Sequence, residues 1–153
     1  MAREYCAECS GRVVPAPNLH LTLAFLGDVP VGRIPGLIAL AGAVRSRSFQ
    51  VAIDMRGYWR HNRVVWAGAA RCPAPLRELL VKLADLMRAN GFRHEAREYV
   101  PHVTLLRDSR RAPTLPVPAP IAWDVSDFVL MRSAPRGRSS GYDIVHRWPF
   151  ERH

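Results

Sequence analysis

The chain has 153 residues, 48% of them hydrophobic, which is enough for a single domain with its own core. No apolar run approaches the roughly 18 residues that a membrane span needs, and the amino terminus lacks the apolar core of a signal peptide. We therefore expect a soluble, cytoplasmic protein with no membrane partner, and the formal net charge of +9 favours a nucleic acid or a phosphorylated small molecule as partner.

The positive charge is almost all arginine, because Lys82 is the only lysine. Guanidinium groups suit bidentate phosphate contacts, but a genome rich in G and C produces the same bias, so both explanations stay open. Cys6, Cys9 and Cys72 lack the spacing of a disulfide framework, which favours a reducing compartment. Cys6 and Cys9 form a lone Cys-x-x-Cys without a second ligand pair, so we expect no metal there, and their role stays open.

The first third of the chain predicts one strand and one helix. Residues 1–17 show no clear period and end in prolines, which indicates an irregular segment. Residues 19–26 are strand-like and stop at Gly27. Apolar residues from Ile34 to Val44 recur at helical spacing, which predicts a helix.

The middle of the chain predicts two strands and the best helix. Residues 49–55 alternate between apolar and polar, which is typical of a half-buried strand, and residues 63–68 form a second strand in a hairpin with it. Residues 75–90 carry a leucine stripe at helical spacing, with Pro75 in the first turn and Gly91 at the end.

The last third predicts a loop and two more strands. Residues 112–120 are too rich in proline for a sheet. Residues 125–132 and 142–149 are strand-like and are separated by a loop over residues 133–141. Because strands mostly follow strands and two helices remain to cover them, the fold class is α+β with largely antiparallel sheet.

One short pattern occurs twice, about 82 residues apart: His20-Leu-Thr-Leu23 and His102-Val-Thr-Leu105. In an extended backbone, histidine and threonine at i and i+2 share one face, while the aliphatic side chains share the other. Two such strands in one sheet would bring two imidazoles and two hydroxyls into a common cleft. We expect two similar half-domains that face each other across a groove.

This pattern suits the cleavage of a phosphodiester without a metal. His20 and His102 can supply the acid and the base, because histidine titrates near neutral pH. Thr22 and Thr104 can donate to the non-bridging oxygens, and we expect Arg107 to share the face of His102 and offset the growing charge. One copy would be typical of an ordinary strand, whereas two copies in one basic domain favour a shared site.

Three other residues are candidates for binding substrate. Trp66 lies mid-strand, where tryptophan is more often core than a platform for a nucleobase. Arg136 and Arg138 flank a glycine and could clamp an RNA backbone, or they could be solvated loop charge. The remaining histidines have no matching partner and are expected at the surface: His61, His94, His146 and His153.

At these residues the chain resembles the two-histidine phosphoesterase superfamily, whose signature is a pair of His-x-Thr-x motifs. More narrowly it resembles the bacterial RNA 2′,3′-cyclic phosphodiesterases, the LigT-like family first described as 2′-5′ RNA ligases. The resemblance runs from about Val14 to Trp148. It includes Asn18–Gly27, Arg63–Trp66, Pro101–Asp108, Arg136–Arg138, Tyr142 and Arg147–Trp148.

The resemblance implies a bilobal, pseudo-twofold α+β fold with antiparallel sheets and flanking helices around a central groove, as one domain over residues 1–153. It also implies hydrolysis of RNA 2′,3′-cyclic phosphate ends to 2′-phosphomonoesters without metal or cofactor. His20 corresponds to the proton donor and His102 to the proton acceptor, while Thr22 and Thr104 would hold the phosphate oxygens. The same step with a 5′-hydroxyl end in place of water would join RNA ends by a 2′-5′ bond.

Two other functions stay open at this point. A phosphodiesterase could use the same histidines on a small cyclic nucleotide or an ADP-ribose cyclic phosphate. A non-catalytic RNA-binding module could keep the basic groove without the chemistry. Two intact His-x-Thr pairs argue against the module, because binding alone does not require them.

The chain departs from the family ahead of the first motif. The family normally begins with an apolar strand and a helix, whereas about 19 residues precede His20 here and contain no such strand. Either the start of the gene was assigned too late or the sheet has lost a strand. An unpaired sheet edge promotes association, so we expect reduced stability or a dimer through that edge in place of the family's monomer.

Overall fold

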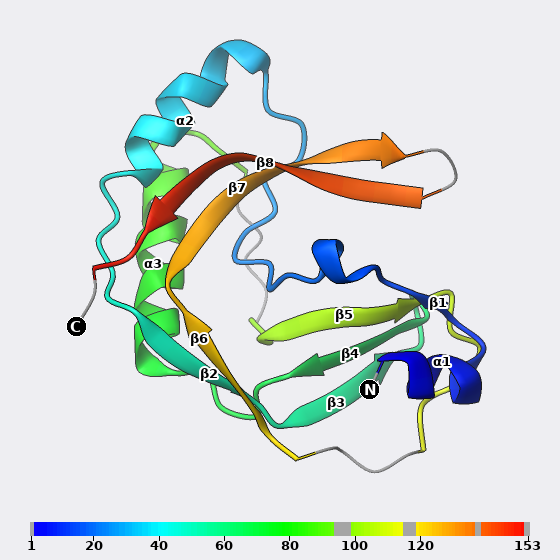
Figure 1. The fold of residues 1–153 in the computed structure, drawn as a ribbon. Coiled ribbons are helices and arrows are strands. Elements are labelled where there is room, and N and C mark those ends of the chain that lie inside the picture. The colour runs from blue at the N-terminus through cyan, green and yellow to red at the C-terminus, as the bar shows by residue number, and fades with distance from the viewer. Residues whose placement is uncertain (1, 94–98, 115–118, 137–138, 152–153) are drawn as a thin grey trace. The chain divides into compact units, whose positions relative to one another are not determined.

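The computed structural model describes residues 2–93, 99–114, 119–136 and 139–151 (Figure 1). Helices and antiparallel sheets make up the fold, which confirms the α+β class. The chain divides into two compact units, each built from three separate segments. The first unit comprises Met1–Thr22, Val51–Cys72 and Tyr99–Trp123, and the second comprises Leu23–Gln50, Pro73–Glu98 and Asp124–His153. Both His-x-Thr motifs belong to the first unit, so the repeat does not divide between the two.

A four-stranded antiparallel sheet forms the centre of the first unit, in the order β1-β5-β4-β3 (Figure 1). Its strands are β1 (Arg12–Val13), β3 (Met55–Trp59), β4 (Val64–Gly68) and β5 (His102–Arg107). One face of the sheet packs into the core of the unit, which contains Val65, Ala67, Val103, Leu105 and Leu106. The opposite face carries His102 and Thr104 of β5, with the rings of Trp59 and Trp66 beside His102.

A helix, α1 (Ala2–Cys9), covers the core face of this sheet. Its buried residues are Tyr5 and Cys9, which lie one turn apart and pack into the core. The prediction of an irregular segment over residues 1–17 is therefore wrong. A helix of two turns that buries two side chains has too few apolar positions to show a period.

The hairpin partner of β4 also differs from the prediction. The alternating segment stops as β2 (Phe49–Ile53), which pairs with β6 (Ile121–Val125), and β3 is the strand that forms the hairpin with β4. Asp54 separates β2 from β3, because its backbone N–H donates to the Gly68 carbonyl and its carboxylate accepts from the Ala70 N–H. Strand β6 was not predicted, because it directly follows the proline-rich segment.

The first motif does not lie in a strand, so the prediction of a strand over residues 19–26 is wrong. After a short 3-10 helix, η1 (Ala16–Asn18), the only sheet contact of the described segment is an isolated antiparallel bridge between Leu21 and Val103. The carbonyls of Asn18 and Thr22 accept hydrogen bonds from side chains instead of from a neighbouring strand.

The second unit contains the two predicted helices. α3 (Ala74–Ala89) matches its prediction within one residue at each end, with Pro75 in the first turn and Gly91 at a φ of +66° after the last. A short 3-10 helix, η2 (Val31–Arg33), precedes α2 (Ile34–Ala41), which ends three residues before the predicted position. Gly42 caps α2, because its N–H donates to the Ile38 carbonyl.

A long antiparallel hairpin, β7 (Asp127–Arg136) and β8 (Ser139–Pro149), completes the second unit. Its pairing continues to Arg136 and Ser139, so most of the loop predicted over residues 133–141 is strand. The strand continues through Pro135, because proline is tolerated in a ribbon of two strands, where each strand has an edge. The core of this unit joins side chains of both helices and the hairpin region: Ala41, Leu79, Leu83, Phe128 and Phe150.

Within the described residues, none of the helices combines the length and the apolar composition that a membrane crossing requires.

Candidate active site

The bridge between Leu21 and Val103 brings the two motifs together within the first unit. Both side chains pack against the core of that unit, so the residues on either side of them face the other way. In an antiparallel register this sets His20 opposite Thr104 and Thr22 opposite His102. In a regular antiparallel pair, residues at such diagonal positions are about 7–8 Å apart. One phosphate group fits between two imidazoles at that spacing.

The two histidines are held in the same way. His20 Nδ1 lies 2.7 Å from the carbonyl oxygen of Asn18, and His102 Nδ1 lies 2.7 Å from that of Val100. A carbonyl oxygen only accepts, so Nδ1 carries the proton in both rings. Nε2 is therefore the atom that gains and loses a proton, and each ring is turned by the backbone two residues before it.

A close approach of β4 to the second motif supports His102. Gly68 lies opposite His102 in the β4–β5 pairing. A Cβ at Gly68 would lie 2.1 Å from the Pro101 carbonyl oxygen, which is far inside contact distance. The N–H of Ala69 donates to the same carbonyl at 3.1 Å. Only glycine at position 68 lets β4 hold the backbone that enters the motif.

Two tryptophans pack beside His102. The Trp59 ring lies edge-on to the imidazole at 4.5 Å between centroids, and the Trp66 ring lies 6.2 Å from it. Trp66 is only 6% exposed, so it offers almost no ring surface to a nucleobase. A Cβ at Gly57 would lie 2.2 Å from the Trp66 ring, so this glycine makes room for the indole. Trp59 was not singled out from the sequence, although it shares a hairpin face with Trp66.

Tyr99 connects the two motifs by a hydrogen bond. Its hydroxyl donates to the Thr22 carbonyl oxygen at 3.0 Å, across 77 residues of sequence. Burial raises the pKa of the Tyr99 phenol well above its usual range, so the phenol remains a donor at all physiological pH values. No signal in the sequence could have identified this contact, because it depends on how distant segments pack.

Arg107 shares the face of His102 only because the strand is irregular. Strict alternation from His102 puts residues 104 and 106 on its face and Arg107 on the other. The register shifts instead, so that Trp66 pairs with Thr104 and Val65 with Leu106. Leu105 and Leu106 are both buried in the core, and this bulge returns Arg107 to the side of His102.

The other candidates are placed as follows. Arg136 ends β7 in the second unit, and Arg138 lies outside the described residues. Cys6 Sγ donates to the Gly11 carbonyl and Cys9 is fully buried; within the described part of the chain, no group of three or more metal-binding side chains gathers. His61 is exposed and His146 packs against Trp148, whereas His94 and His153 lie outside the described residues.

Comparisons with known proteins point to one family. The model of the "LigT like Phosphoesterase" family matches residues 1–66. The chain is 40% identical over 142 residues to an RNA 2′,3′-cyclic phosphodiesterase of Escherichia coli, covering 91% of this chain and 80% of the relative. It is 28% identical over 145 residues to one of Thermus thermophilus, covering 88% and 73%.

Solved structures agree with the sequence comparisons. E. coli LigT in its apo form superposes with a TM-score of 0.86 at 36% identity, covering 97% of this chain and 85% of that one. E. coli LigT in complex with 3′-AMP also has a TM-score of 0.86, at 35% identity, and the match covers 97% and 91% of the two chains.

Proposed function

This chain belongs to the LigT-like phosphoesterase family, and we propose on that basis that it is an RNA 2′,3′-cyclic phosphodiesterase. It opens the cyclic phosphate at the 3′ end of an RNA without a metal or cofactor and leaves a 2′-phosphomonoester. The observation that supports the proposal is the Leu21–Val103 bridge, which joins the segments of the two His-x-Thr motifs within the first unit.

The two histidines divide the acid and base work. His102 Nε2 takes a proton from water while the water oxygen forms a new bond to phosphorus. The bond from phosphorus to the 3′ oxygen breaks, and His20 Nε2 delivers its proton to that oxygen. The step ends with His102 protonated and His20 neutral, so both rings exchange a proton with solvent before the next cycle.

The neighbouring groups hold the phosphate and the rings. The hydroxyls of Thr22 and Thr104 donate to the non-bridging oxygens, whose negative charge grows in the transition state. The edge-on contact of Trp59 with His102 limits rotation of that ring. The Nδ1 hydrogen bonds of both histidines are made within each motif, so both rings are preorganised before substrate binds.

The test is to incubate a short RNA ending in 2′,3′-cyclic phosphate with the protein in the presence of a chelator and to map the product end. We expect a 2′-phosphate product that is lost in both His20→Ala and His102→Ala. The reaction needs one imidazole neutral and the other protonated, so its rate should rise and then fall around neutral pH. Loss of activity in chelator, or a flat profile between about pH 5 and 9, would contradict the mechanism.

The same assay separates the alternatives. Turnover of mononucleotide cyclic phosphates alone would favour a small-molecule phosphodiesterase, and binding without turnover would favour an RNA-binding module. Incubation with a 5′-hydroxyl RNA in place of water as acceptor tests for 2′-5′ ligation, in which the 5′ oxygen bonds to phosphorus as the bond from phosphorus to the 3′ oxygen breaks.

We propose the cytoplasm as the compartment, which the three free cysteines support. We propose a monomer as the resting state and association through an edge of the β1-β5-β4-β3 sheet as the alternative. Light scattering at several concentrations tests the two, because edge association would raise the average mass with concentration.

A further inference from the structure

We propose that Cys6 and Cys9 form an oxidation site, at which a peroxide joins the two thiols in a disulfide and releases the end of α1 from the segment that follows β5. Neither cysteine takes part in the proposed reaction, so the oxidation itself is independent of the proposed function. Its effect on catalysis rests on that function, because β5 contains His102, Thr104 and Arg107.

The two cysteines lie one turn apart at the end of a helix. Side chains three residues apart on a helix have Cβ atoms about 5–6 Å apart, whereas a disulfide needs about 3.5–4.5 Å. A small rearrangement can therefore join the thiols, but α1 does not keep its last turn when they are joined. The Ser10 N–H closes this turn by donating to the Cys6 carbonyl at 3.0 Å. Ser10 itself has a left-handed φ of 55°, so the chain leaves the helix directly after Cys9.

The surroundings of the two thiols give them different roles. Cys6 is partly exposed, and its Sγ donates to the Gly11 carbonyl at 2.9 Å. Cys9 is fully buried, and burial raises the pKa of its thiol. An oxidant from solvent therefore reacts with Cys6 first, and Cys9 is the resolving thiol.

The oxidation balances with hydrogen peroxide as the oxidant. The Cys6 sulfur bonds to one peroxide oxygen and becomes a sulfenic acid, while the O–O bond breaks and the other oxygen leaves as water with the thiol proton. The Cys9 sulfur then bonds to the Cys6 sulfur, and the S–O bond breaks to release a second water with the Cys9 proton. The two thiols lose two electrons in total, and the peroxide gains them. In a reducing compartment such a disulfide is typical of redox sensing.

The end of α1 holds the segment that follows β5. The Cys9 carbonyl accepts hydrogen bonds from the Ser109 hydroxyl at 3.3 Å and from the Arg110 N–H at 3.1 Å. The Arg111 Nε donates to the Glu8 carbonyl at 2.8 Å. These are carbonyls of the last helical turn, which have no partner within the helix. Opening that turn moves both carbonyls and breaks these hydrogen bonds.

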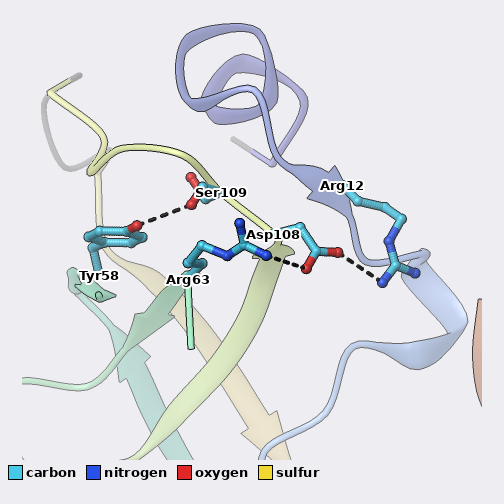
Figure 2. Close-up of polar contacts among 5 residues, drawn as sticks. All are labelled: Arg12, Tyr58, Arg63, Asp108 and Ser109. Atoms are coloured by element: carbon cyan, nitrogen blue, oxygen red, sulfur yellow. Dashed lines mark hydrogen bonds and ion pairs between the residues drawn. The ribbon is translucent and has the colours of Figure 1, made fainter. Parts of the chain in front are cut away.

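The first residues after α1 lie directly against the end of β5. A Cβ at Gly11 would lie 3.1 Å from the Arg107 carbonyl oxygen. Arg12 pairs with Arg107 in the β1–β5 ladder, and its guanidinium lies 3.2 Å from the Asp108 carboxylate (Figure 2). A change in the last turn of α1 therefore reaches Arg107, which is the cation that we expect to offset the charge of the reacting phosphate.

The other side of this segment has its own contacts. The Tyr58 hydroxyl donates to the Ser109 carbonyl at 3.1 Å, and the Arg63 guanidinium lies 3.7 Å from the Asp108 carboxylate (Figure 2). The Ser109 N–H also donates to the Arg63 carbonyl at 2.9 Å. Because these contacts come from β3 and from the residue before β4, oxidation should shift the end of β5 without unfolding the sheet.

The test exposes the full chain to hydrogen peroxide, blocks the remaining thiols by alkylation and digests the protein with trypsin. Cleavage after Arg3 and Arg12 gives one peptide, residues 4–12, that contains both thiols, whereas Cys72 falls in another peptide. We expect the peptide from oxidised protein to be unalkylated and lighter than the reduced peptide by two hydrogen atoms. Dithiothreitol should restore both thiols.

Hydrogen exchange and kinetics measure the consequences. The Arg110 amide, which donates to the Cys9 carbonyl, should exchange about tenfold faster in the oxidised protein. The Ser109 amide, which donates to the Arg63 carbonyl, should exchange as before and is the internal control. The value of kcat/KM on cyclic-phosphate RNA should fall about tenfold and return on reduction, because the end of β5 is displaced.

Three variants identify the thiols responsible. Cys6→Ser keeps a donor to the Gly11 carbonyl but forms no disulfide, so its rate should not change in peroxide. Cys9→Ala removes the resolving thiol and should also be insensitive. Cys72→Ser is the matched control and should lose its rate as the wild type does. Melting curves of the untreated variants show whether each one folds as the wild type does.

Several outcomes would overturn the inference. Peroxide treatment that leaves both thiols in the peptide of residues 4–12, or that links Cys6 to a second chain, would show that this site does not form. A disulfide with unchanged Arg110 exchange or unchanged kcat/KM would show that α1 does not act on β5. An equal loss of rate in Cys6→Ser would place the sensitivity elsewhere. If the wild type turns over no RNA, the proposed function fails, and the peptide mass and the exchange rates still decide on the oxidation site.

Discussion

The two His-x-Thr motifs carry the same side chains on very different backbones. His102 and Thr104 lie in β5, an inner strand that pairs with β4 on one side and β1 on the other. His20 and Thr22 lie in an irregular segment whose sheet contact is the single Leu21–Val103 bridge. Both imidazoles still have the same hydrogen bond from Nδ1 to a carbonyl two residues earlier. Orienting such a histidine therefore requires a fixed carbonyl and the correct register, and not a regular strand.

The difference lies in what holds each motif in place. The second motif is held by ladder hydrogen bonds and by the close approach of Gly68 to Pro101. The first depends on contacts from distant side chains, such as the Tyr99 hydroxyl on the Thr22 carbonyl. We therefore expect the first motif to be the easier one to displace by a single substitution outside it.

Removing the imidazole of either motif should have the largest effect on the rate. The loss should be of similar size for the two motifs. His20→Ala and His102→Ala should each lower kcat on cyclic-phosphate RNA by about 10²–10⁴, because each removes one partner of the acid–base pair. Single-turnover kinetics measures the loss, with the exposed His61→Ala in the same unit as the matched control. A variant that retains wild-type kcat would show that its imidazole takes no part in the chemistry.

Removing a threonine hydroxyl should cost less. Thr22→Val and Thr104→Val keep the side-chain shape but lose the donor, and each should lower kcat by about tenfold to a hundredfold. The matched serine variants retain the hydroxyl and should recover most of the rate. If the valine and serine variants behave alike at either position, the hydroxyl there does not hold the phosphate.

Adding a methyl group at Gly68 should disturb the second motif alone. Gly68→Ala forces a Cβ into the Pro101 carbonyl oxygen and should destabilise the fold by about 1–3 kcal/mol. Urea denaturation measures this, and Gly32→Ala, whose Cβ meets nothing within 4 Å, is the control. An unchanged denaturation midpoint would mean that β4 can move away without cost.

Removing the Tyr99 hydroxyl should disturb the first motif. Tyr99→Phe deletes the donor to the Thr22 carbonyl and should cost about 1 kcal/mol of stability. The rate should fall about threefold to tenfold, because the Thr22 backbone becomes less well positioned. Equal kcat in the variant and the wild type would show that the first motif keeps its position without this contact.

The smallest expected effect is on the pH dependence of stability. Burial raises the pKa of the Tyr99 phenol, so above about pH 10 the unfolded chain releases this proton while the folded chain keeps it. The free energy of unfolding should therefore fall as pH rises above about 10, and the fall should be smaller in Tyr99→Phe. Burial also raises the pKa of Tyr5, which accounts for a remaining slope. Urea midpoints at about pH 8 and about pH 10.5 compare the two proteins.

Local patterns in the sequence were sufficient for part of this molecule. The leucine stripe of α3, the alternation in β2 and the paired His-x-Thr pattern depend on residues within one element, and periodicity detects such arrangements. The α+β class followed from the order of these elements. The face shared by His102 and Thr104 followed from the alternation within β5.

The tertiary structure alone decided how these pieces are connected. The hairpin partner of β4, the bulge that turns Arg107 toward the side of His102 and the Tyr99 contact all depend on residues that are far apart in the chain. Alternation specifies which side chains share a face, but it leaves open which distant backbone satisfies each N–H and carbonyl group. In the tertiary structure, the first motif pairs through the single Leu21–Val103 bridge, whereas the second motif is part of the inner strand β5.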